Sequence, residues 1–268
     1  MKTVLITGAG GGMGKAAVDL FVQSGCRVLA ADIKPCEERE NVVPLRMDVR
    51  DEDSVKAAFG KASEAVGELY AIVHLAGIYA LDSLVEMPTP EFERIIDVNL
   101  KGAFLVNKTF LPLLKEGARI IIVTSELAVR DPLPFTGIYG ISKSALDGYA
   151  YSLRMELQLL GMTVSVLRAG AVDTGMISDS TNRLDEFCRK TEIYECNAKR
   201  FRGIVDRVEA RRVPPARIAR KLLSIAGKRH PRFAYAVNRN PMLILFDLLP
   251  MRLRFFIIRT VLRDRGGE

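Results

Sequence analysis

The sequence predicts an α/β fold in which a parallel sheet of about seven strands is covered by helices on both faces. Short runs rich in Val, Ile and Leu alternate along the chain with stretches whose apolar residues recur at helical spacing. The strand-like runs are apolar throughout instead of alternating with polar residues, which is typical of parallel strands buried on both faces. With 268 residues, the chain is long enough to bury one large core.

Seven short apolar runs are expected to be strands. The first, Thr3–Gly10, reads TVLITGAG and ends in glycines. In order, the runs cover residues 3–10, 27–33, 42–49, 69–77, 118–125, 162–170 and 233–238. Helical spacing fills the connections at residues 12–25, 51–66, 90–114 and 139–160. Ligands of such sheets bind beyond the carboxyl ends of the strands, so the residues at those ends are the candidates for a site.

Composition argues against a metal centre and a disulfide framework. The four cysteines, Cys26, Cys36, Cys188 and Cys196, form no C-x-x-C pair, and the chain has two histidines. The apolar run at the N-terminus is too short for a signal peptide, and no uncharged apolar stretch reaches the ~18 residues of a membrane span. A reducing, cytoplasmic setting is therefore expected.

Charge is distributed unevenly along the chain. Residues 1–198 hold 21 basic and 27 acidic side chains, a net charge of −6, whereas residues 199–268 hold 18 basic and 5 acidic side chains, a net charge of +13. A positive segment of this kind could bind nucleic acid or anionic lipid. It could equally be a solvated basic face that has no binding partner.

A glycine-rich turn follows the first expected strand and opens the first helix, where residues 7–14 read TGAGGGMG. Glycines let a backbone turn tightly and approach a pyrophosphate, and a helix N-terminus offers free N–H groups and a positive dipole end. The position of the turn between strand and helix predicts a dinucleotide site. Its candidate residues are Thr7, Gly8, Gly10, Gly12, Met13 and Gly14.

Asp32 ends the second expected strand, about 20 residues further on, where a carboxylate can accept hydrogen bonds from the adenosine ribose hydroxyls. Because it would repel a 2′-phosphate, NAD(H) is favoured over NADP(H), although Lys15 and Lys34 lie close in the sequence. After the third strand, the side chain of Asp48 could hold the adenine amino group. The adenosine candidates are Asp32, Ile33, Asp48 and Val49.

Tyr139 and Lys143 stand four residues apart at the start of a helix, and therefore on one face of it. A phenol has a pKa near ~10, which makes it a poor proton donor or acceptor at neutral pH. A neighbouring ammonium favours the phenolate and lowers that pKa. The pair therefore has the chemistry of a general acid/base.

Further features accompany this pair in a fixed order: LAG at Leu75–Gly77, VNLKG at Val98–Gly102, Ser125 at the end of the fifth strand, and YGISK from Tyr139. Together with TGAGGGMG they resemble the short-chain dehydrogenase/reductase family over residues 1–180. The resemblance implies a single Rossmann-type domain, expected over residues 1–240, that moves hydride between nicotinamide C4 and a substrate carbon.

The resemblance also implies a catalytic set of Asn99, Ser125, Tyr139 and Lys143. Tyr139 would be the acid/base and Ser125 would orient the substrate oxygen, with Thr124 as the alternative. Lys143 would bind the nicotinamide ribose and lower the pKa of the tyrosine, and Asn99 would hold a water that relays protons. Cofactor contacts are implied for Ala76, Gly77, Tyr139, Lys143, Val172 and Thr174.

The chain departs from the family pattern at two turns. The family sequence NNAG reads His74-Leu75-Ala76-Gly77, and PG after the sixth strand reads Ala169-Gly170. His74 is interpreted as a packed substitute for the asparagine that steadies the central strands. The missing proline is expected to loosen the second turn.

The segment after the sixth strand covers the substrate in this family, here at about residues 175–214. Its apolar residues could line a pocket or serve ordinary helix packing; they are Met176, Ile177, Phe187, Tyr194 and Phe201. The following stretch, with a Pro-led helix and then KRHPRFAY, resembles more loosely the hydroxysteroid and retinol dehydrogenase branch.

The last residues, 241–268, form an apolar and basic extension expected to be helical. Leu, Ile and Phe are interspersed with four arginines, and Asp247 and Pro250 interrupt the run. The arginines are Arg252, Arg254, Arg259 and Arg263. Three interpretations remain open: a contact with a membrane surface, a cap over the substrate mouth, and a subunit interface.

The sequence thus predicts an NAD(H)-dependent oxidoreductase that interconverts a secondary alcohol and a ketone on a lipophilic, steroid-like or retinoid-like substrate. Two alternatives are a 3-oxoacyl-thioester reductase, which Asp32 disfavours because such reductases usually prefer NADPH, and a nucleotide-sensing or nucleic-acid-binding protein. Intact Ser125, Tyr139 and Lys143 argue against the last. The family resemblance suggests a homodimer or homotetramer.

Overall fold

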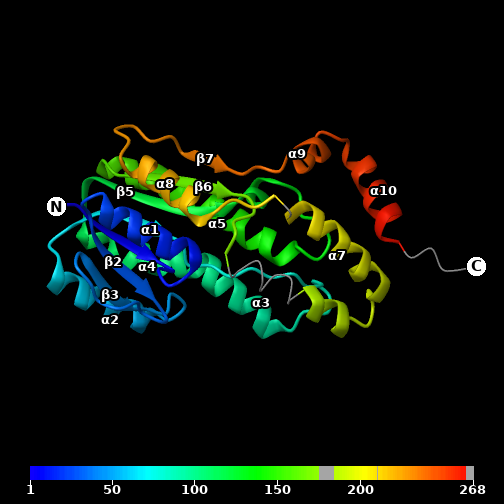
Figure 1. Ribbon diagram of the computed structural model, residues 1–268, viewed down its shortest axis with the longest axis horizontal. Coiled ribbons are helices and arrows are strands. Elements are labelled where there is room, and N and C mark those ends of the chain that lie inside the picture. The colour runs from blue at the N-terminus through cyan, green and yellow to red at the C-terminus, as the bar shows by residue number, and fades with distance from the viewer. Residues whose placement is uncertain (175–183, 210, 264–268) are drawn as a thin grey trace, which may run out of the picture.

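The computed structural model describes residues 1–174, 184–209 and 211–263. Within these ranges, seven strands form one parallel sheet in the order β3-β2-β1-β4-β5-β6-β7 (Figure 1). The strands are β1 (Thr3–Thr7), β2 (Arg27–Asp32), β3 (Val42–Arg46), β4 (Leu69–His74), β5 (Leu114–Ser125), β6 (Thr163–Ala169) and β7 (Ala234–Val237). The predicted α/β fold is confirmed.

The strands carry apolar side chains on both faces because helices cover both. On β1, Val4 and Ile6 face one core cluster and Leu5 faces the other. The first cluster is completed by α1 (Gly12–Gln23) and α8 (Pro215–Ala226), and the second by α2 (Glu52–Ala65), α4 (Gly102–Phe110) and α5 (Gly137–Leu157). Continuous burial on both faces explains why these strands lack a polar alternation.

The strand order reverses between β1 and β4. From β1 the chain adds β2 and β3 on one side, and from β4 it adds β5, β6 and β7 on the other. Pro44 in β3 is tolerated because β3 is an edge strand with one free side. The loops after β1 and β4 therefore meet at the point where open α/β sheets bind their ligands.

The expected helix over residues 90–114 is broken into pieces. It consists of α3 (Thr89–Ile96), a π-helical turn at Asp97–Lys101, α4, and a 3-10 turn at Leu111–Leu113, after which β5 begins at Leu114. A π-helical turn inserts one extra residue per turn and often marks a functional site. Here it carries Asn99, which is almost completely buried.

Apart from α8 and β7 (Ala234–Val237), the part of the chain after β6 lies beyond one end of the sheet. It contains a helical stretch at 184–190, α7 (Glu195–Glu209), α9 (Pro241–Asp247) and α10 (Met251–Leu262). Figure 1 shows α7, α9 and α10 together at the end of the molecule opposite the N-terminus. The predicted helical extension is confirmed, and no helix among the described residues is long and apolar enough to cross a membrane.

Candidate active site

The glycine turn after β1 is built from backbone segments in direct contact. A Cβ atom added to Gly14 would lie 2.0 Å from the carbonyl oxygen of Gly8, and one added to Gly8 would lie 2.6 Å from the amide nitrogen of Ala76. Gly8 also adopts a left-handed conformation, with φ of 67°. This tight turn leads directly into α1, so the N–H groups at the start of that helix face an open cradle that fits a pyrophosphate.

Thr7 supports the turn from inside. Its side chain is fully buried, and its hydroxyl accepts hydrogen bonds from the N–H groups of Leu75 and Ala76, both at 3.3 Å. These bonds tie the end of β1 to the end of β4. Any contribution of Thr7 to cofactor binding is therefore the positioning of the two loops.

Asp32 lies at the end of β2, against the glycine turn. Its carboxylate accepts hydrogen bonds from the N–H of Gly10 at 2.9 Å and from the N–H of Lys34 at 3.1 Å. Each carboxylate oxygen can accept more than one bond, so both remain able to accept from a diol. Ile33, the next residue, is half exposed beside it.

The end of β3 presents Asp48 and Val49. The guanidinium of Arg50 contacts both oxygens of Asp48, at 2.7 Å and 3.0 Å, and this hydrogen bonding holds the pKa of that carboxyl below its usual range. Val49 is buried against Gly102, where an added Cβ would lie 2.7 Å from its side chain. Asp48 thus remains an acceptor at neutral pH, although it already has a cationic partner.

Asn99 connects the loop after β4 to α5. Its amide nitrogen donates to the carbonyl of Ile78 at 3.0 Å and to the hydroxyl of Ser142 at 2.9 Å, while its oxygen accepts the N–H of Ile78 at 2.8 Å. Ser142 in turn donates to the carbonyl of Tyr139. These bonds fix the first turn of α5 relative to the sheet.

Lys143 is buried close to this network. A Cβ atom added to Gly77 would lie 3.1 Å from the Lys143 Nζ and 3.3 Å from the Asn99 Oδ1, so all three residues converge on one point. Burial lowers the pKa of the Lys143 amine from its ordinary value of 10.5 to about 8. The Lys143 Nζ lies 5.8 Å from the centre of the Tyr139 ring.

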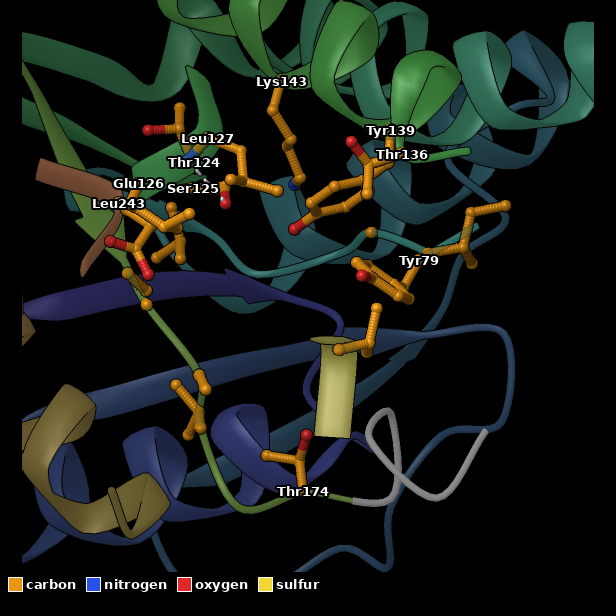
Figure 2. Close-up of a pocket in the computed structure, with 18 of the residues that line it drawn as sticks. Tyr79, Thr124, Ser125, Glu126, Leu127, Thr136, Tyr139, Lys143, Thr174 and Leu243 are labelled. Atoms are coloured by element: carbon orange, nitrogen blue, oxygen red, sulfur yellow. Dashed lines mark hydrogen bonds between the residues drawn. The ribbon is translucent and has the colours of Figure 1, made fainter. Parts of the chain in front are cut away.

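Tyr139 and Ser125 approach each other across the pocket from α5 and β5 (Figure 2). The ring of Tyr79 packs edge-on against that of Tyr139, with 4.6 Å between their centres. The Ser125 hydroxyl accepts the N–H of Leu127 at 3.1 Å, which leaves its hydrogen available for donation. Thr124, the alternative, points elsewhere: its hydroxyl donates to the carboxylate of Asp147.

Asp147 and Arg168 form a partly buried ion pair near this site that sequence reasoning missed. Arg168 on β6 donates two hydrogen bonds to Asp147 on α5, at 2.7 Å and 3.0 Å. With Thr124, they join β5, β6 and α5 where the catalytic candidates project. The available signal was the spacing, because Asp147 follows Lys143 by one helical turn.

The pocket encloses a cavity of about 160 Å³ with mainly apolar walls. The dinucleotide end holds Met13, Gly77, Val172 and Thr174, and Figure 2 shows Thr174 beside the start of α1. The opposite wall comes from α7 and α9, through Phe201, Ile204, Val205 and Leu243. Of the predicted catalytic set, the pocket therefore contains Ser125, Tyr139 and Lys143, and Asn99 lies close to Lys143 beside Gly77.

Of the predicted substrate-covering side chains, Phe201 lines this pocket. Phe187 and Tyr194 instead pack with Phe135 in a neighbouring aromatic cluster, with ring centres 4.8 Å and 5.3 Å from that of Phe135. Met176 and Ile177 lie outside the described residues. Leu243 was missed because nothing local in the sequence relates α9 to a pocket more than a hundred residues earlier.

His74 is a packed residue, as interpreted from the sequence. Its Nε2 lies 2.8 Å from the Oδ1 of Asn107, and Asn107 donates to the hydroxyl of Tyr149. Burial lowers the pKa of His74 to about 4. The neutral imidazole thus takes part in a hydrogen-bond chain within the core.

A family model described as short chain dehydrogenase matches residues 2–185. This chain belongs to the short-chain dehydrogenase/reductase family. The protein is therefore an oxidoreductase of an NAD(P)-dependent family that acts on small molecules. The glycine cradle fits that cofactor.

Two curated relatives are similar to this dehydrogenase/reductase over most of its length. The oxidoreductase YxbG of Bacillus subtilis is 31% identical over 187 residues, which cover 66% of this chain and 68% of the relative. The 3-oxoacyl-[acyl-carrier-protein] reductase FabG of Thermotoga maritima is 31% identical over 212 residues, which cover 75% of this chain and 84% of the relative.

Solved structures of the family share the fold of this dehydrogenase/reductase. A short chain dehydrogenase family protein of Francisella tularensis aligns with a TM-score of 0.74 at 21% identity, covering 88% of this chain and 97% of its own. The 3-ketoacyl-(acyl-carrier-protein) reductase of Brucella melitensis, complexed with NADH, aligns with a TM-score of 0.72 at 22% identity, covering 88% and 96%.

Proposed function

We propose that this protein interconverts a secondary alcohol and a ketone on a lipophilic substrate, with NAD(H) as cofactor. The observation that supports this most strongly is one apolar pocket that contains Ser125, Tyr139 and Lys143 and opens onto the glycine turn. A steroid-like or retinoid-like substrate is favoured by the apolar walls and by the looser resemblance of the stretch after residue 213. Residues 1–240 would form the catalytic domain.

The chain's own residues have defined tasks in this proposal. Tyr139 exchanges a proton with the substrate oxygen, and Ser125 donates a hydrogen bond that holds this oxygen in place. Lys143, while protonated, binds the ribose hydroxyls of the dinucleotide and favours the phenolate of Tyr139. When bound, the dinucleotide supplies or accepts the hydride.

Asn99 has a more restricted role than its residue type suggests. Both N–H groups of its amide are engaged, with Ile78 and Ser142, and its oxygen already accepts one hydrogen bond. The second lone pair of that oxygen, close to Lys143, is the position through which Asn99 would hold a relaying water.

A cofactor-paired substrate screen tests the proposal. The purified full chain is given NADH or NADPH with a panel of ketosteroids, retinal and acyl β-ketones. We expect turnover that is fastest with NADH and an apolar cyclic ketone. Absence of turnover with every carbonyl and alcohol, under both cofactors, would overturn the proposed activity.

A second candidate is reduction of a 3-oxoacyl thioester. It is supported by the similarity to the reductase FabG of Thermotoga maritima, which extends further along this chain than the similarity to YxbG. An apolar pocket also suits an acyl chain. Faster turnover of acyl β-keto thioesters than of ketosteroids, together with a preference for NADPH, would favour this candidate over the first.

Replacing Asp32 is expected to weaken the preference for NADH. In Asp32→Ala, the ratio of kcat/KM for NADH to that for NADPH should fall roughly 10- to 100-fold, because hydrogen bonds to the ribose are lost and repulsion of a 2′-phosphate is relieved. The measurement is initial rates with both cofactors at one substrate concentration. Asp53→Ala removes an exposed carboxylate from α2 and serves as the control. A wild type that already prefers NADPH would contradict the assignment.

We also propose that α10 contacts an anionic membrane surface, so that a cytoplasmic enzyme works as a peripheral membrane protein. Large apolar side chains are exposed along α9, α10 and the turn between them, among them Leu248 at 77% and Phe255 and Phe256 at 64% each. Residues 251–262 contain three arginines and no carboxylate, and two of these arginines, Arg252 and Arg259, are exposed, whereas Arg254 pairs with Asp131. An apolar face bordered by arginines suits the interface of a bilayer with anionic lipid.

Substitution of exposed side chains tests this contact better than removal of the tail, because Leu243 and Leu262 are buried and deletion would expose the core. Phe255→Ser combined with Phe256→Ser is expected to weaken binding to phosphatidylserine-containing vesicles about 10- to 100-fold in a sedimentation assay. Leu159→Ser, at an exposed position far along the chain, is the control. Equal sedimentation of all variants would contradict the proposal, and a loss of dimers instead would identify α10 as a subunit interface.

A homodimer or homotetramer remains part of the proposal. Exposed apolar side chains on α4 and α5, namely Phe104, Ile141, Tyr151 and Met155, provide a surface that a second copy of the chain could cover.

A further inference from the structure

We infer that the carboxyl group of Glu126 is a second anchor for the substrate, which binds a hydroxyl group remote from the reacting carbon. The inference rests on the proposed function and adds to it a class of substrate: an apolar alcohol or ketone that carries a second hydroxyl. Neither the family match nor the catalytic candidates require a carboxylate at this position.

Glu126 lies in the wall of the pocket, immediately after Ser125. In the view of Figure 2, Ser125 lies between the phenol of Tyr139 and the carboxyl group of Glu126. A substrate whose reacting oxygen lies at Tyr139 and Ser125 would therefore extend toward Glu126. The side chain is 9% exposed, and its neighbours in the pocket wall include Leu127 and Leu243.

The two carboxylate oxygens of Glu126 differ in their surroundings. Oε2 accepts the N–H of Asn240 at 2.8 Å and lies 3.9 Å from the guanidinium of Arg130. Oε1 lies beside Gly170, where an added Cβ would come within 2.9 Å of it. Within the described parts of the chain, the recorded donors reach Oε2 and none reaches Oε1.

Oε1 is not among the fully enclosed side-chain atoms that lack a partner, so water reaches it in the free protein and is displaced when an apolar substrate fills the pocket. An oxygen that loses its water without gaining a donor costs roughly 1–3 kcal/mol. The pocket walls are mainly apolar and cannot supply that donor. Arg130 is directed in part to another carboxylate, since it also forms an ion pair with Asp247. A hydroxyl group of the substrate would provide the missing hydrogen bond.

The charge around Glu126 favours a hydroxyl over an ammonium group. A small depression beside Glu126 is lined by Arg211 and Arg239, and the guanidinium of Arg130 lies 3.9 Å from Oε2 of Glu126. These cations would repel an ammonium group. Burial also raises the pKa of the Glu126 carboxyl, against the opposing effect of the Asn240 N–H and Arg130, and a hydroxyl can both donate to and accept from such a group.

Matched ligands test this inference. One pair is 17β-hydroxy-5α-androstan-3-one and 5α-androstan-3-one, and a smaller series of cyclic ketones carries the hydroxyl at increasing distance from the carbonyl, each with its deoxy partner. For the wild type we expect at least one pair in which KM and the calorimetric Kd for the hydroxylated ligand are about 10- to 100-fold lower.

Two variants of Glu126 distinguish recognition of the substrate hydroxyl from a purely structural role of this side chain. Glu126→Leu should abolish the difference within the pair, with the deoxy ketone affected by no more than about two-fold. Glu126→Gln keeps an acceptor for Asn240 and should retain part of the difference.

The outcomes distinguish this inference from the proposed function. The role of Glu126 is overturned if the wild type has the same KM and Kd for the hydroxylated and deoxy ketones of every pair. It is also overturned if Glu126→Leu weakens binding of both members equally. Either result counts even if the deoxy ketone is turned over with NADH. Absence of turnover with both members overturns the proposed reaction. The calorimetric comparison still reports whether the hydroxyl is recognised in that case.

Discussion

Tyr139→Phe is expected to lower kcat/KM by about 10³-fold or more while leaving the Kd for NADH within about three-fold. The phenol is the one group in the proposal that exchanges a proton with the substrate oxygen, and general acid/base catalysis contributes about 10² to 10⁴ in rate. Removing only the hydroxyl keeps the ring, and with it the packing against Tyr79. Steady-state kinetics and fluorescence titration of NADH provide the two readouts.

Tyr151→Phe is the matched control for this variant. It removes the same hydroxyl from the same helix, at a position where the side chain is 55% exposed. Its activity should equal that of the wild type. If Tyr139→Phe lost NADH binding as severely as turnover, the tyrosine would be part of the cofactor site and not the acid/base.

Lys143→Met is expected to abolish turnover and, at the same time, to stabilise the free protein. The wild type folds with a buried amine whose pKa is lowered from 10.5 to about 8. A shift of this size corresponds to roughly 3 kcal/mol of destabilisation, and methionine fills the space without a charge. We expect a gain of roughly 1–3 kcal/mol in the free energy of unfolding, measured by urea denaturation without cofactor.

The pH dependence of that gain has a defined sign. Below about pH 8 the folded wild type carries the full cost of a buried ammonium, so the gain is largest there. Between about 8 and 10.5 the unfolded chain binds more protons than the folded one, so the wild type gains stability as the pH rises and the difference disappears. Lys108→Met, at an exposed position on α4, is the control. A constant difference from pH 7 to 10.5 would show that the gain comes from packing.

The fold and the centre of the site could be predicted from local patterns. Buried strands can be predicted from apolar runs in the sequence, and the carboxyl ends of parallel strands must meet at one edge of the sheet. Asp32, Ser125 and the glycine turn end or follow such strands, so their convergence follows from topology. Helical spacing predicts that Tyr139 and Lys143 share one face of a helix, and the family resemblance implies their catalytic roles.

The rest of the site depends on contacts that no local pattern encodes. Leu243 reaches the pocket because the chain continues from β7 into α9 beyond the end of the sheet, and Glu126 meets Asn240 across 114 residues. Contacts of this kind depend on which surfaces meet, and composition does not determine that. The tail could therefore be recognised as apolar and basic, with a cap over the substrate mouth as one of three interpretations, while the residue that reaches the pocket, Leu243, could not be identified.

The tail is fastened to the segment that follows the catalytic serine candidate. Arg130 pairs with Asp247, and Arg254 pairs with Asp131 at 2.5 Å. Both pairs connect the loop that follows β5 and the 3-10 turn at Glu126–Val129 to α9 and α10. A membrane surface, a fused tag or a bound antibody that displaces α10 should therefore change the turnover rate of the enzyme as well as its location. A tag at the N-terminus, at the opposite end of the molecule from α10, should leave the turnover rate unchanged.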